Sequence, residues 1–345
     1  MKNIVYCGGV PIGGDYISVQ SMLNVSPYDV DASLLQIDSL KKAKCDIVRL
    51  AVPDVKAATV LKDIVRHSAL PIVADIHFSA ALAVKSIEAG VAKIRLNPGN
   101  VKGDLKRVVD MAKERKIPIR IGINHGSIEK EFKNLPVSDA LVASAIKQVD
   151  LLEKLSFSDI VISVKSSSVA DTVEAYEKLS KLCYPLHIGV TEAGTKENGI
   201  IKNAMAIGAL LLKGIGDTIR VSLSCDPVEE ILCARKMLNF LGLRKDMIEV
   251  ISCPTCGRTE IDVALIADQV EREFNYLAKP LKIAVMGCVV NGIGESEGAD
   301  VGLAGGKEKS SVFMDGKIVE TVENDKIFDT LKKYILIKAE EKINE

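Results

Sequence analysis

Three cysteines and one glutamate in the C-terminal third of the chain form the pattern with the clearest chemistry. Cys253 and Cys256 stand in a Cys-Pro-Thr-Cys-Gly string, Cys288 follows, and Glu295 lies in the glycine-rich segment after it. A Cys-x-x-Cys pair with one distant cysteine suits an iron–sulfur cluster whose fourth iron has a weaker ligand. A glycine-rich loop can fold a carboxylate back toward such a cluster, so Glu295 is the candidate fourth ligand. An exchangeable carboxylate would open one iron to substrate, which indicates catalysis rather than electron storage.

The same cysteines also allow a structural zinc site, which is the usual role of a CPxCG string. However, no histidine follows His187 and no second Cys-x-x-Cys pair is present, so a tetrahedral zinc site lacks an obvious fourth ligand here. The remaining cysteines lie singly in apolar or helical surroundings, form no disulfide pattern and are interpreted as buried thiols. They are Cys7, Cys45, Cys183, Cys225 and Cys233.

Polar side chains also stand at the ends of seven of the eight short apolar runs earlier in the chain, and five of these ends carry a cation. In order along the chain they are Arg49, Asp75 and His77, Arg95 and Asn97, Arg120 and Asn124, Lys165, Thr191 and Glu192, and Arg220 and Ser222. Crowded cations repel one another unless an anion joins them, and these runs carry no matching number of carboxylates. Guanidinium groups bind phosphate oxygens in pairs, so the set predicts a diphosphate ligand.

Two residues near these cations are candidates for proton transfer. Glu192 follows Thr191 in a glycine-flanked segment and would stay ionised beside the cations, so it is the candidate proton donor to substrate. His77, two residues after Asp75, could act as an acid or hydrogen-bond donor, and a structural histidine is the equal alternative.

The elements that must position these groups are eight Val/Ile/Leu-rich strands, each followed by a helical pattern. The expected strands are Ile17–Met22, Asp46–Val52, Pro71–Ile76, Val91–Leu96, Pro118–Ile123, Asp159–Lys165, Leu186–Val190 and Thr218–Leu223. Apolar strands alternating with helices predict a parallel sheet, and eight regular units predict a (β/α)8 barrel, whose active site lies at the carboxyl ends of the strands. A doubly wound sheet is the rival, but no GxGxxG follows the first strand and no GxxxxGK occurs.

The pattern changes after a helix expected at Pro227–Phe240, so we expect a barrel domain over 1–240 and a smaller α+β domain over 241–345. The second domain should contain a strand running into Cys253, a helix near Thr259–Tyr276 and a strand at Lys282–Met286. A hairpin turning at Asp315-Gly316 and a closing helix at Asp325–Lys338 should follow.

Composition excludes several classes of function. The chain has 345 residues, 48% of them hydrophobic and 4% aromatic, and 45 Lys and Arg against 46 Asp and Glu give a net charge of −1. No basic field points to nucleic acid or an anionic membrane. No signal sequence is apparent, and no apolar stretch reaches the roughly 20 residues that span a bilayer. We therefore expect a cytoplasmic protein, a compartment that also suits unpaired thiols.

Motifs along nearly the whole chain resemble those of the 4-hydroxy-3-methylbut-2-enyl diphosphate synthases. They include Gln20-Ser21-Met22, Ala74-Asp75-Ile76-His77-Phe78, Arg95-Leu96-Asn97-Pro98-Gly99-Asn100, Asn124-His125-Gly126-Ser127, Gly189–Gly194, Ser252–Thr259 and Gly287–Glu295. The resemblance implies reductive ring opening and dehydration of 2-C-methyl-D-erythritol 2,4-cyclodiphosphate for isoprenoid synthesis in the MEP pathway. It also implies a 4Fe-4S cluster on Cys253, Cys256, Cys288 and Glu295, with electrons from ferredoxin or flavodoxin.

The resemblance places diphosphate-binding roles on the five strand-end cations and a catalytic role on Glu192. It also implies a homodimer, which barrel topology predicts independently. The last barrel helix returns the chain to the face opposite the active site, so two chains arranged head to tail could each cap the other's barrel. The alternative is a non-redox barrel lyase or aldolase acting on a phosphosugar, with the three cysteines in a structural zinc site.

Overall fold

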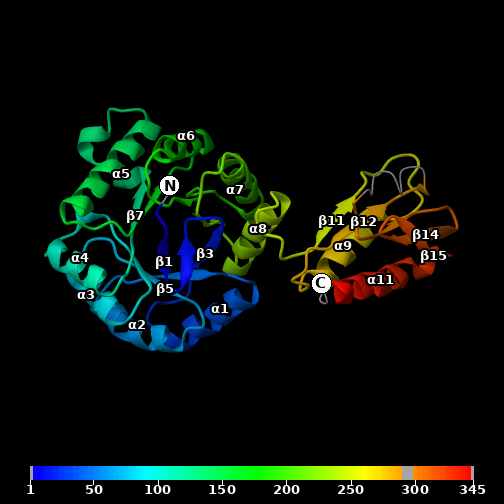
Figure 1. Cartoon of the computed structure of the whole chain (residues 1–345), viewed down its shortest axis with the longest axis horizontal. Helices are drawn as coiled ribbons and strands as arrows, with labels where there is room; N and C mark the ends of the chain where they lie inside the picture. The colour runs from blue at the N-terminus through cyan, green and yellow to red at the C-terminus, as the bar shows by residue number, and fades with distance from the viewer. Residues whose placement is uncertain (1–2, 290–297, 343–345) are drawn as a thin grey trace. The chain divides into compact units, whose positions relative to one another are not determined.

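The computed structural model describes residues 3–289 and 298–342, and its contacts divide the chain into one unit over Met1–Met237 and another over Leu238–Glu345. The first unit is an eight-stranded parallel barrel surrounded by helices, and the second is a smaller mixed sheet with helices (Figure 1). This confirms the predicted fold class, a (β/α)8 barrel followed by an α+β domain.

The barrel strands follow the predicted runs closely. They are β3 (Ser18–Met22), β4 (Ile47–Ala51), β5 (Ile72–Asp75), β6 (Lys93–Arg95), β7 (Ile119–Asn124), β8 (Ile160–Lys165), β9 (His187–Ile188) and β10 (Thr218–Ile219). Their order in the sheet is β8-β7-β6-β5-β4-β3-β10-β9, and a bridge between Ile162 and Leu186 joins the two ends. Regular pairing in β9 and β10 is much shorter than expected. Gly189, which follows β9, has a φ near +148°. This backbone conformation departs from strand geometry, and residues with a side chain rarely adopt it, so β9 ends here.

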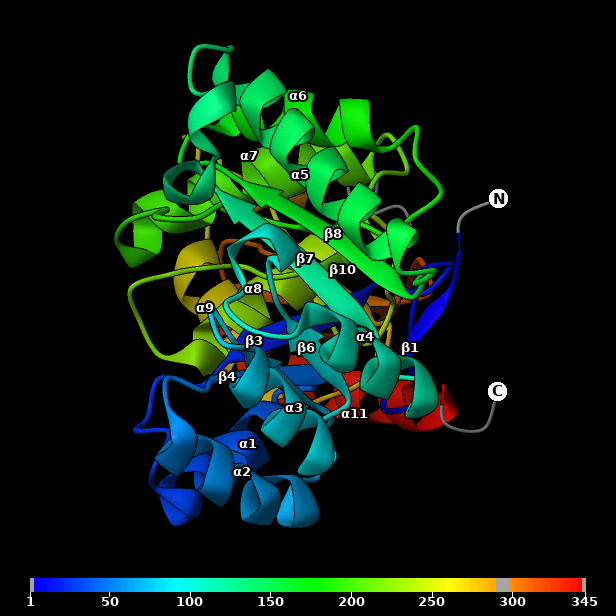
Figure 2. The same cartoon turned by 90° about the vertical axis from the view of Figure 1, so that its left-hand side faces the viewer.

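The surrounding helices are α1 (Val30–Lys42), α2 (Val55–His67), α3 (Ala80–Glu88), α4 (Leu105–Glu114), α5 (Val137–Lys154), α6 (Val169–Leu179), α7 (Lys196–Leu211) and α8 (Pro227–Phe240). Figure 2 shows helices α3 to α7 packed outside the obliquely running strands. Five of these helices begin with an Asp or Ser cap whose side chain accepts a backbone N–H of the first turn. The caps are Asp29 for α1, Asp54 for α2, Ser79 for α3, Asp104 for α4 and Ser168 for α6. These caps fix where each strand-to-helix loop ends, and therefore where the strand-end side chains lie.

A hairpin that the sequence did not suggest precedes the barrel. It consists of β1 (Val5–Cys7) and β2 (Val10–Ile12), paired antiparallel. Cys7 and Ile12 are fully buried and pack with Ile47, Val73 and Val161 near the amino ends of the barrel strands. The hairpin therefore forms an apolar floor, which leaves the carboxyl ends of the strands as the open mouth.

The second unit has a five-stranded sheet in the order β11 (Glu249–Ser252), β12 (Lys282–Met286), β13 (Val301–Ala304), β14 (Lys309–Met314) and β15 (Lys317–Glu323). The first three strands are parallel and the last two run antiparallel. Helices α9 (Val263–Phe274) and α11 (Ile327–Glu341) share one apolar core with the sheet. The hairpin at Asp315 and Gly316 was predicted, whereas β13 was not.

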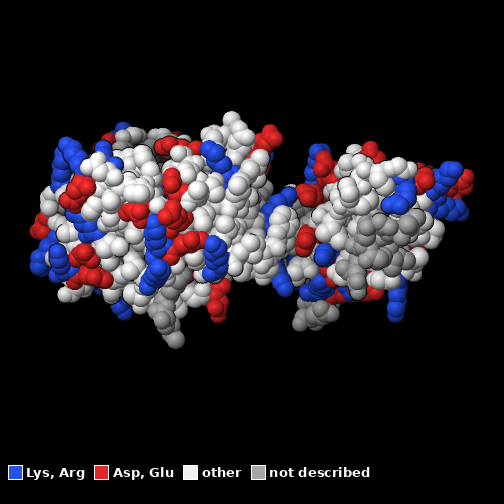
Figure 3. All heavy atoms as spheres, turned by 90° about the horizontal axis from the view of Figure 1, so that it is seen from above, with Lys and Arg blue, Asp and Glu red and all other residues white. Residues whose placement is uncertain are grey.

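Charged side chains of both signs are interspersed over the visible face in Figure 3, without a large field of one sign. In the part of the chain that the structure describes, no helix combines the length and the hydropathy that a membrane crossing requires.

Candidate active site

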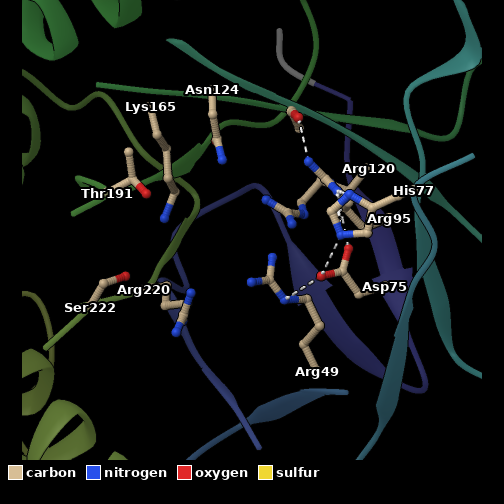
Figure 4. Close-up of a pocket in the computed structure, with 11 residues that line it drawn as sticks. Arg49, Asp75, His77, Arg95, Arg120, Asn124, Lys165, Thr191, Arg220 and Ser222 are labelled. Carbon is tan, nitrogen blue, oxygen red and sulfur yellow. Dashed lines mark hydrogen bonds and ion pairs between the residues drawn. The ribbon is translucent and has the colours of Figure 1, made fainter. Parts of the chain in front are cut away.

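The structure brings most of the predicted strand-end residues together in one cavity of about 110 Å³ in the barrel mouth. The lining residues from strands β4 to β8 are Arg49, Asp75, Arg95, Arg120, Asn124 and Lys165, and those from the segments that follow β5, β9 and β10 are His77, Thr191, Arg220 and Ser222. Four of them end their strands, whereas Arg49 lies in the middle of β4 and Arg120 is the second residue of β7. Arg49, Arg95 and His77 converge on Asp75, while Lys165, Arg220 and Ser222 approach from other strands (Figure 4). Side chains far apart in sequence thus form a single cationic pocket.

Asp75 is the shared counter-ion of two arginines. Its carboxylate lies 3.7 Å from Arg49 Nε and 3.3 Å from Arg95 Nη1, and 3.7 Å from His77 Nε2. Burial alone would raise the pKa of Asp75, but the two guanidinium charges and the His77 hydrogen bond outweigh it and hold the pKa below its ordinary value. Asp75 therefore stays ionised and fixes the two guanidinium groups on one side of the pocket.

A glycine makes room for the most constrained arginine. Arg95 Nη2 donates to the carbonyl of Gly122 at 2.8 Å, and Asn97 exchanges two hydrogen bonds with the backbone of Gly122, at 3.0 and 2.9 Å. A Cβ atom at Gly122 would lie 2.7 Å from Arg95 Nε, so only glycine lets the guanidinium lie across this strand. Gly122 was not among the predicted site residues, because a glycine inside a strand pattern does not reveal which side chain crosses it.

The pocket holds its cations out of water. Burial lowers the pKa of Arg49 to about 10, and it lowers the pKa values of Arg120 and Lys165 well below their ordinary ranges. Neighbouring cations contribute to these shifts in the same direction, since Arg220 acts on Arg49 and Lys165, and Arg49 acts on Arg120. A bound anion would relieve this repulsion, so the pocket is built for a ligand with several negative charges.

Glu230, in the first turn of α8, lies beside the lining residue Arg220 and was not among the residues predicted for this site. It is only 5% exposed, its Oε1 accepts the backbone N–H of Leu223 at 2.8 Å, and its Oε2 lies 3.9 Å from Arg220 Nη2. Burial raises the pKa of Glu230, while Arg220 and Lys165 act in the opposite direction. Nothing in the local sequence distinguishes it from Glu229, so only the fold could identify it.

Glu192, like Asn97, is a predicted residue that the structure does not place in the lining. Its neighbour Thr191 lines the cavity, but the Glu192 side chain is exposed and its backbone has a φ of 53°. This left-handed residue stands between the lining residue Thr191 and Ala193, which is 3% exposed. The role expected of Glu192 thus remains a proposal.

The second unit brings its three predicted cysteines to one cavity. Cys253 follows β11 and Cys288 follows β12, and because these strands pair in parallel their ends meet at the same edge of the sheet. Cys253, Cys256 and Cys288 line a cavity of about 250 Å³ together with Gly287 and other residues of the two loops. Glu295 lies outside the described residues.

The immediate surroundings of these thiols suit metal-bound sulfur. The backbone N–H of Gly287 donates to Cys253 Sγ at 3.1 Å, and the backbone N–H of Arg258, with the Thr259 side chain, lowers the pKa of Cys256. Such donors favour the thiolate, which is the form that binds metal. Among the described residues no three His, Cys, Asp or Glu side chains lie close enough to share a single metal ion. In an iron–sulfur cluster each thiolate binds a different iron, so the thiolates must line one cavity but need not lie within reach of a single metal position.

A (β/α)8 barrel with a buried cationic mouth, joined to a unit with three clustered thiols, defines the structural class of this chain. Family comparisons agree, because residues 2–235 match the GcpE TIM-barrel domain and residues 249–336 match the GcpE protein C-terminal domain. The chain belongs to the GcpE family.

Curated relatives cover almost all of the chain, and each is named 4-hydroxy-3-methylbut-2-en-1-yl diphosphate synthase (flavodoxin). A relative from Caldanaerobacter subterraneus is 54% identical over 95% of this chain and 94% of its own length. One from Fusobacterium nucleatum is 50% identical over 96% of both chains, and one from Geobacillus thermodenitrificans is 47% identical over 98% of this chain and 92% of its own. These names support the predicted synthase and not the non-redox lyase.

Solved structures show a likeness of fold alone. Dihydropteroate synthase from Stenotrophomonas maltophilia matches 69% of this chain and 97% of its own with a TM-score of 0.53 at 14% identity. A truncated 3-deoxy-D-arabino-heptulosonate 7-phosphate synthase from Thermotoga maritima matches 70% of this chain and 94% of its own with a TM-score of 0.51 at 13% identity. Both matches are consistent with the (β/α)8 architecture.

Proposed function

We propose that this chain forms 4-hydroxy-3-methylbut-2-en-1-yl diphosphate from 2-C-methyl-D-erythritol 2,4-cyclodiphosphate by reductive ring opening and dehydration. The observation that carries the proposal is the charge of the barrel pocket. Its five cations face two carboxylates, Asp75 and Glu230, so these seven groups carry a net charge of +3 when all are ionised. A diphosphate supplies negative charge of matching size, and paired oxygens suited to guanidinium forks.

The reduction requires electrons, and the second unit is the proposed place for them. We assign a 4Fe-4S cluster to Cys253, Cys256 and Cys288, with Glu295 as the fourth ligand. When bound, such a cluster supplies single electrons received from a small carrier. The relatives' names favour flavodoxin as this carrier, and ferredoxin is the other candidate.

The barrel residues have separate roles in this proposal. The five cations bind and orient the diphosphate, and Asn124, Thr191 and Ser222 supply neutral hydrogen bonds to the remaining substrate oxygens. Asp75 keeps Arg49 and Arg95 in place, and His77 lies where it can donate to substrate or to Asp75. Glu192, next to the lining residue Thr191, is the proposed donor of a proton to the departing hydroxyl group.

We also propose that the active form is a head-to-tail homodimer in the cytoplasm. The pocket lies at the carboxyl ends of the barrel strands, whereas α8 returns the chain toward their amino ends before the second unit begins. A second copy with C2 symmetry could then supply its cysteine unit to the pocket. Sedimentation analysis should give a dimer, and a fully active monomer would contradict the arrangement. All eight cysteines, each within the described residues, are free thiols, which suits a reducing compartment. Of the five expected to be buried, Cys7 and Cys45 are, whereas Cys225 and Cys233 are half-buried and Cys183 is exposed, so the expectation was wrong for these three.

The decisive experiment is anaerobic purification followed by metal analysis and turnover. We expect about four irons and four sulfides per chain, and conversion of the cyclic diphosphate with chemically reduced flavodoxin. Arg120→Met should abolish detectable turnover because it removes a buried pocket cation, whereas Arg107→Met, on the exposed face of α4, should behave as wild type.

Stoichiometric zinc without iron after anaerobic reconstitution, together with no electron-dependent turnover, would refute the synthase assignment. Equal losses in both arginine variants would instead show that the pocket is not the substrate site.

A further inference from the structure

Lys93 is a fully buried cation that the proposed mechanism does not use. It begins β6, two residues before Arg95, so its side chain shares the barrel interior with Arg95. Its exposed fraction is 0%, and within the part of the chain that the structure describes its Nζ atom has no hydrogen-bond partner. A buried lysine in this state needs a physical explanation, because an unpaired ammonium in a dry interior is costly.

The groups that face Lys93 offer little compensation for its charge. Cys7 on the floor hairpin and Arg49 and Arg120 on β4 and β7 interact with it electrostatically, and it in turn acts on His187 of β9. Burial, followed by the surrounding cations, lowers the pKa of His187 well below its ordinary value, so that imidazole is neutral. Three neutral side chains on inward-facing strand positions also have polar atoms without a hydrogen-bond partner among the described residues: Gln20 on β3, Ser163 on β8 and Thr218 on β10.

The carboxylate on the neighbouring strand is already engaged. Asp75 lies beside Arg49, Arg95 and His77. Burial lowers the pKa of Lys93 to about 8, with Arg120 and Arg49 acting in the same direction and Cys7 in the opposite one. Negative charge introduced into the cationic mouth would attract a proton to this site.

We propose that Lys93 is an internal proton-exchange site of the diphosphate pocket, partly uncharged when the pocket is empty and protonated when a diphosphate fills it. The neutral amine takes one proton from solvent and becomes an ammonium, and no covalent or redox step is involved. Binding of the anion is therefore coupled to proton uptake, and the pocket gains positive charge only when a ligand requires it. The inference rests on the proposed function in one respect, the diphosphate nature of the ligand.

The coupling can be measured without turnover, with inorganic pyrophosphate as the ligand and the cluster-containing enzyme. Titration calorimetry at pH 8 in buffers of different ionisation enthalpy gives the number of protons taken up on binding. Because the Lys93 pKa in the empty pocket is about 8, this residue should contribute about half a proton there. The ionisation of pyrophosphate and of Lys165 contributes equally to each protein compared and cancels in the difference.

Lys93→Met should remove about half a proton from the measured uptake and weaken pyrophosphate binding about tenfold at pH 7, because one positive charge close to the pocket is lost. Lys93→Gln tests the same loss of charge with a polar side chain, in case methionine disturbs the barrel. Lys102→Met is the matched control, since Lys102 is exposed in the loop after the same strand and should leave the proton count unchanged.

The two proposals fail in different ways. Normal pyrophosphate binding with the same proton uptake in wild type and both Lys93 variants would refute the role of Lys93 alone. Failure of wild type to bind pyrophosphate would refute the diphosphate pocket, and the inference about Lys93 with it.

Discussion

Replacing Asp75 with asparagine tests whether the barrel mouth is held together by a shared buried counter-ion. The asparagine keeps the shape and one oxygen acceptor, but it leaves Arg49 and Arg95 without their carboxylate. The three side chains are 12%, 8% and 6% exposed for Arg49, Arg95 and Asp75, respectively. Water therefore cannot take over the role of the lost charge.

The expected loss is large for a single substitution. Removing one partner of a buried ion pair costs about 3–5 kcal/mol, since the other charge stays buried. For a unit of the size of Met1–Met237, 1 kcal/mol corresponds to roughly 2–4 °C in melting temperature, so Asp75→Asn should lower the Tm of the barrel by about 10 °C. The folded-state pKa of Asp75 is depressed, so its contribution is present above about pH 4 and is lost as the pH falls further.

Thermal unfolding with and without inorganic pyrophosphate distinguishes a counter-ion from a mere packing residue. Pyrophosphate should raise the Tm of Asp75→Asn more than that of wild type, because the ligand replaces the missing negative charge. Asp110→Asn is the control. It breaks an exposed ion pair with Lys106 on α4, and it should leave the Tm unchanged.

A Tm for Asp75→Asn within about 2 °C of wild type would refute the counter-ion role. A large loss of stability that pyrophosphate does not reduce preferentially would show that Asp75 matters for packing rather than for charge.

Three further predictions follow from the same structure. Glu230→Gln keeps an acceptor for the Leu223 N–H but frees Arg220, so calorimetry should show pyrophosphate binding about fivefold tighter, and unchanged or weaker binding would contradict this. Cys256→Ala should lose bound iron and visible absorbance. Cys183→Ala, which removes an exposed thiol of the barrel unit, should retain both, and full iron in both variants would oppose the cluster assignment. Lys93 keeps its proton up to about pH 10 in the unfolded chain but only up to about pH 8 in the folded chain. Chemical denaturation should therefore show that the free energy of unfolding of wild type, relative to that of Lys93→Met, rises between these two pH values. A difference that does not change with pH would contradict burial of the charge.

Local patterns in the sequence were sufficient for the barrel and for most of the pocket. Strand positions repeat every two residues, so the polar members of a run such as Arg220 and Ser222 must share one face, and parallel strands bring their carboxyl ends to one mouth. The same reasoning located Cys253 and Cys288 at the ends of two strands, which proved to be parallel neighbours. These features depend on short-range geometry that a linear sequence displays.

Tertiary structure alone decided which charges meet and which remain alone. Three features depend on residues distant in sequence: Glu230 of α8 lies beside Arg220, two arginines share Asp75, and Lys93 is isolated above the floor hairpin. The exposure of Glu192 is associated with a left-handed backbone conformation that the neighbouring residues do not predict. Periodicity tells which face a side chain occupies, but burial and charge pairing arise only when separate elements pack against one another.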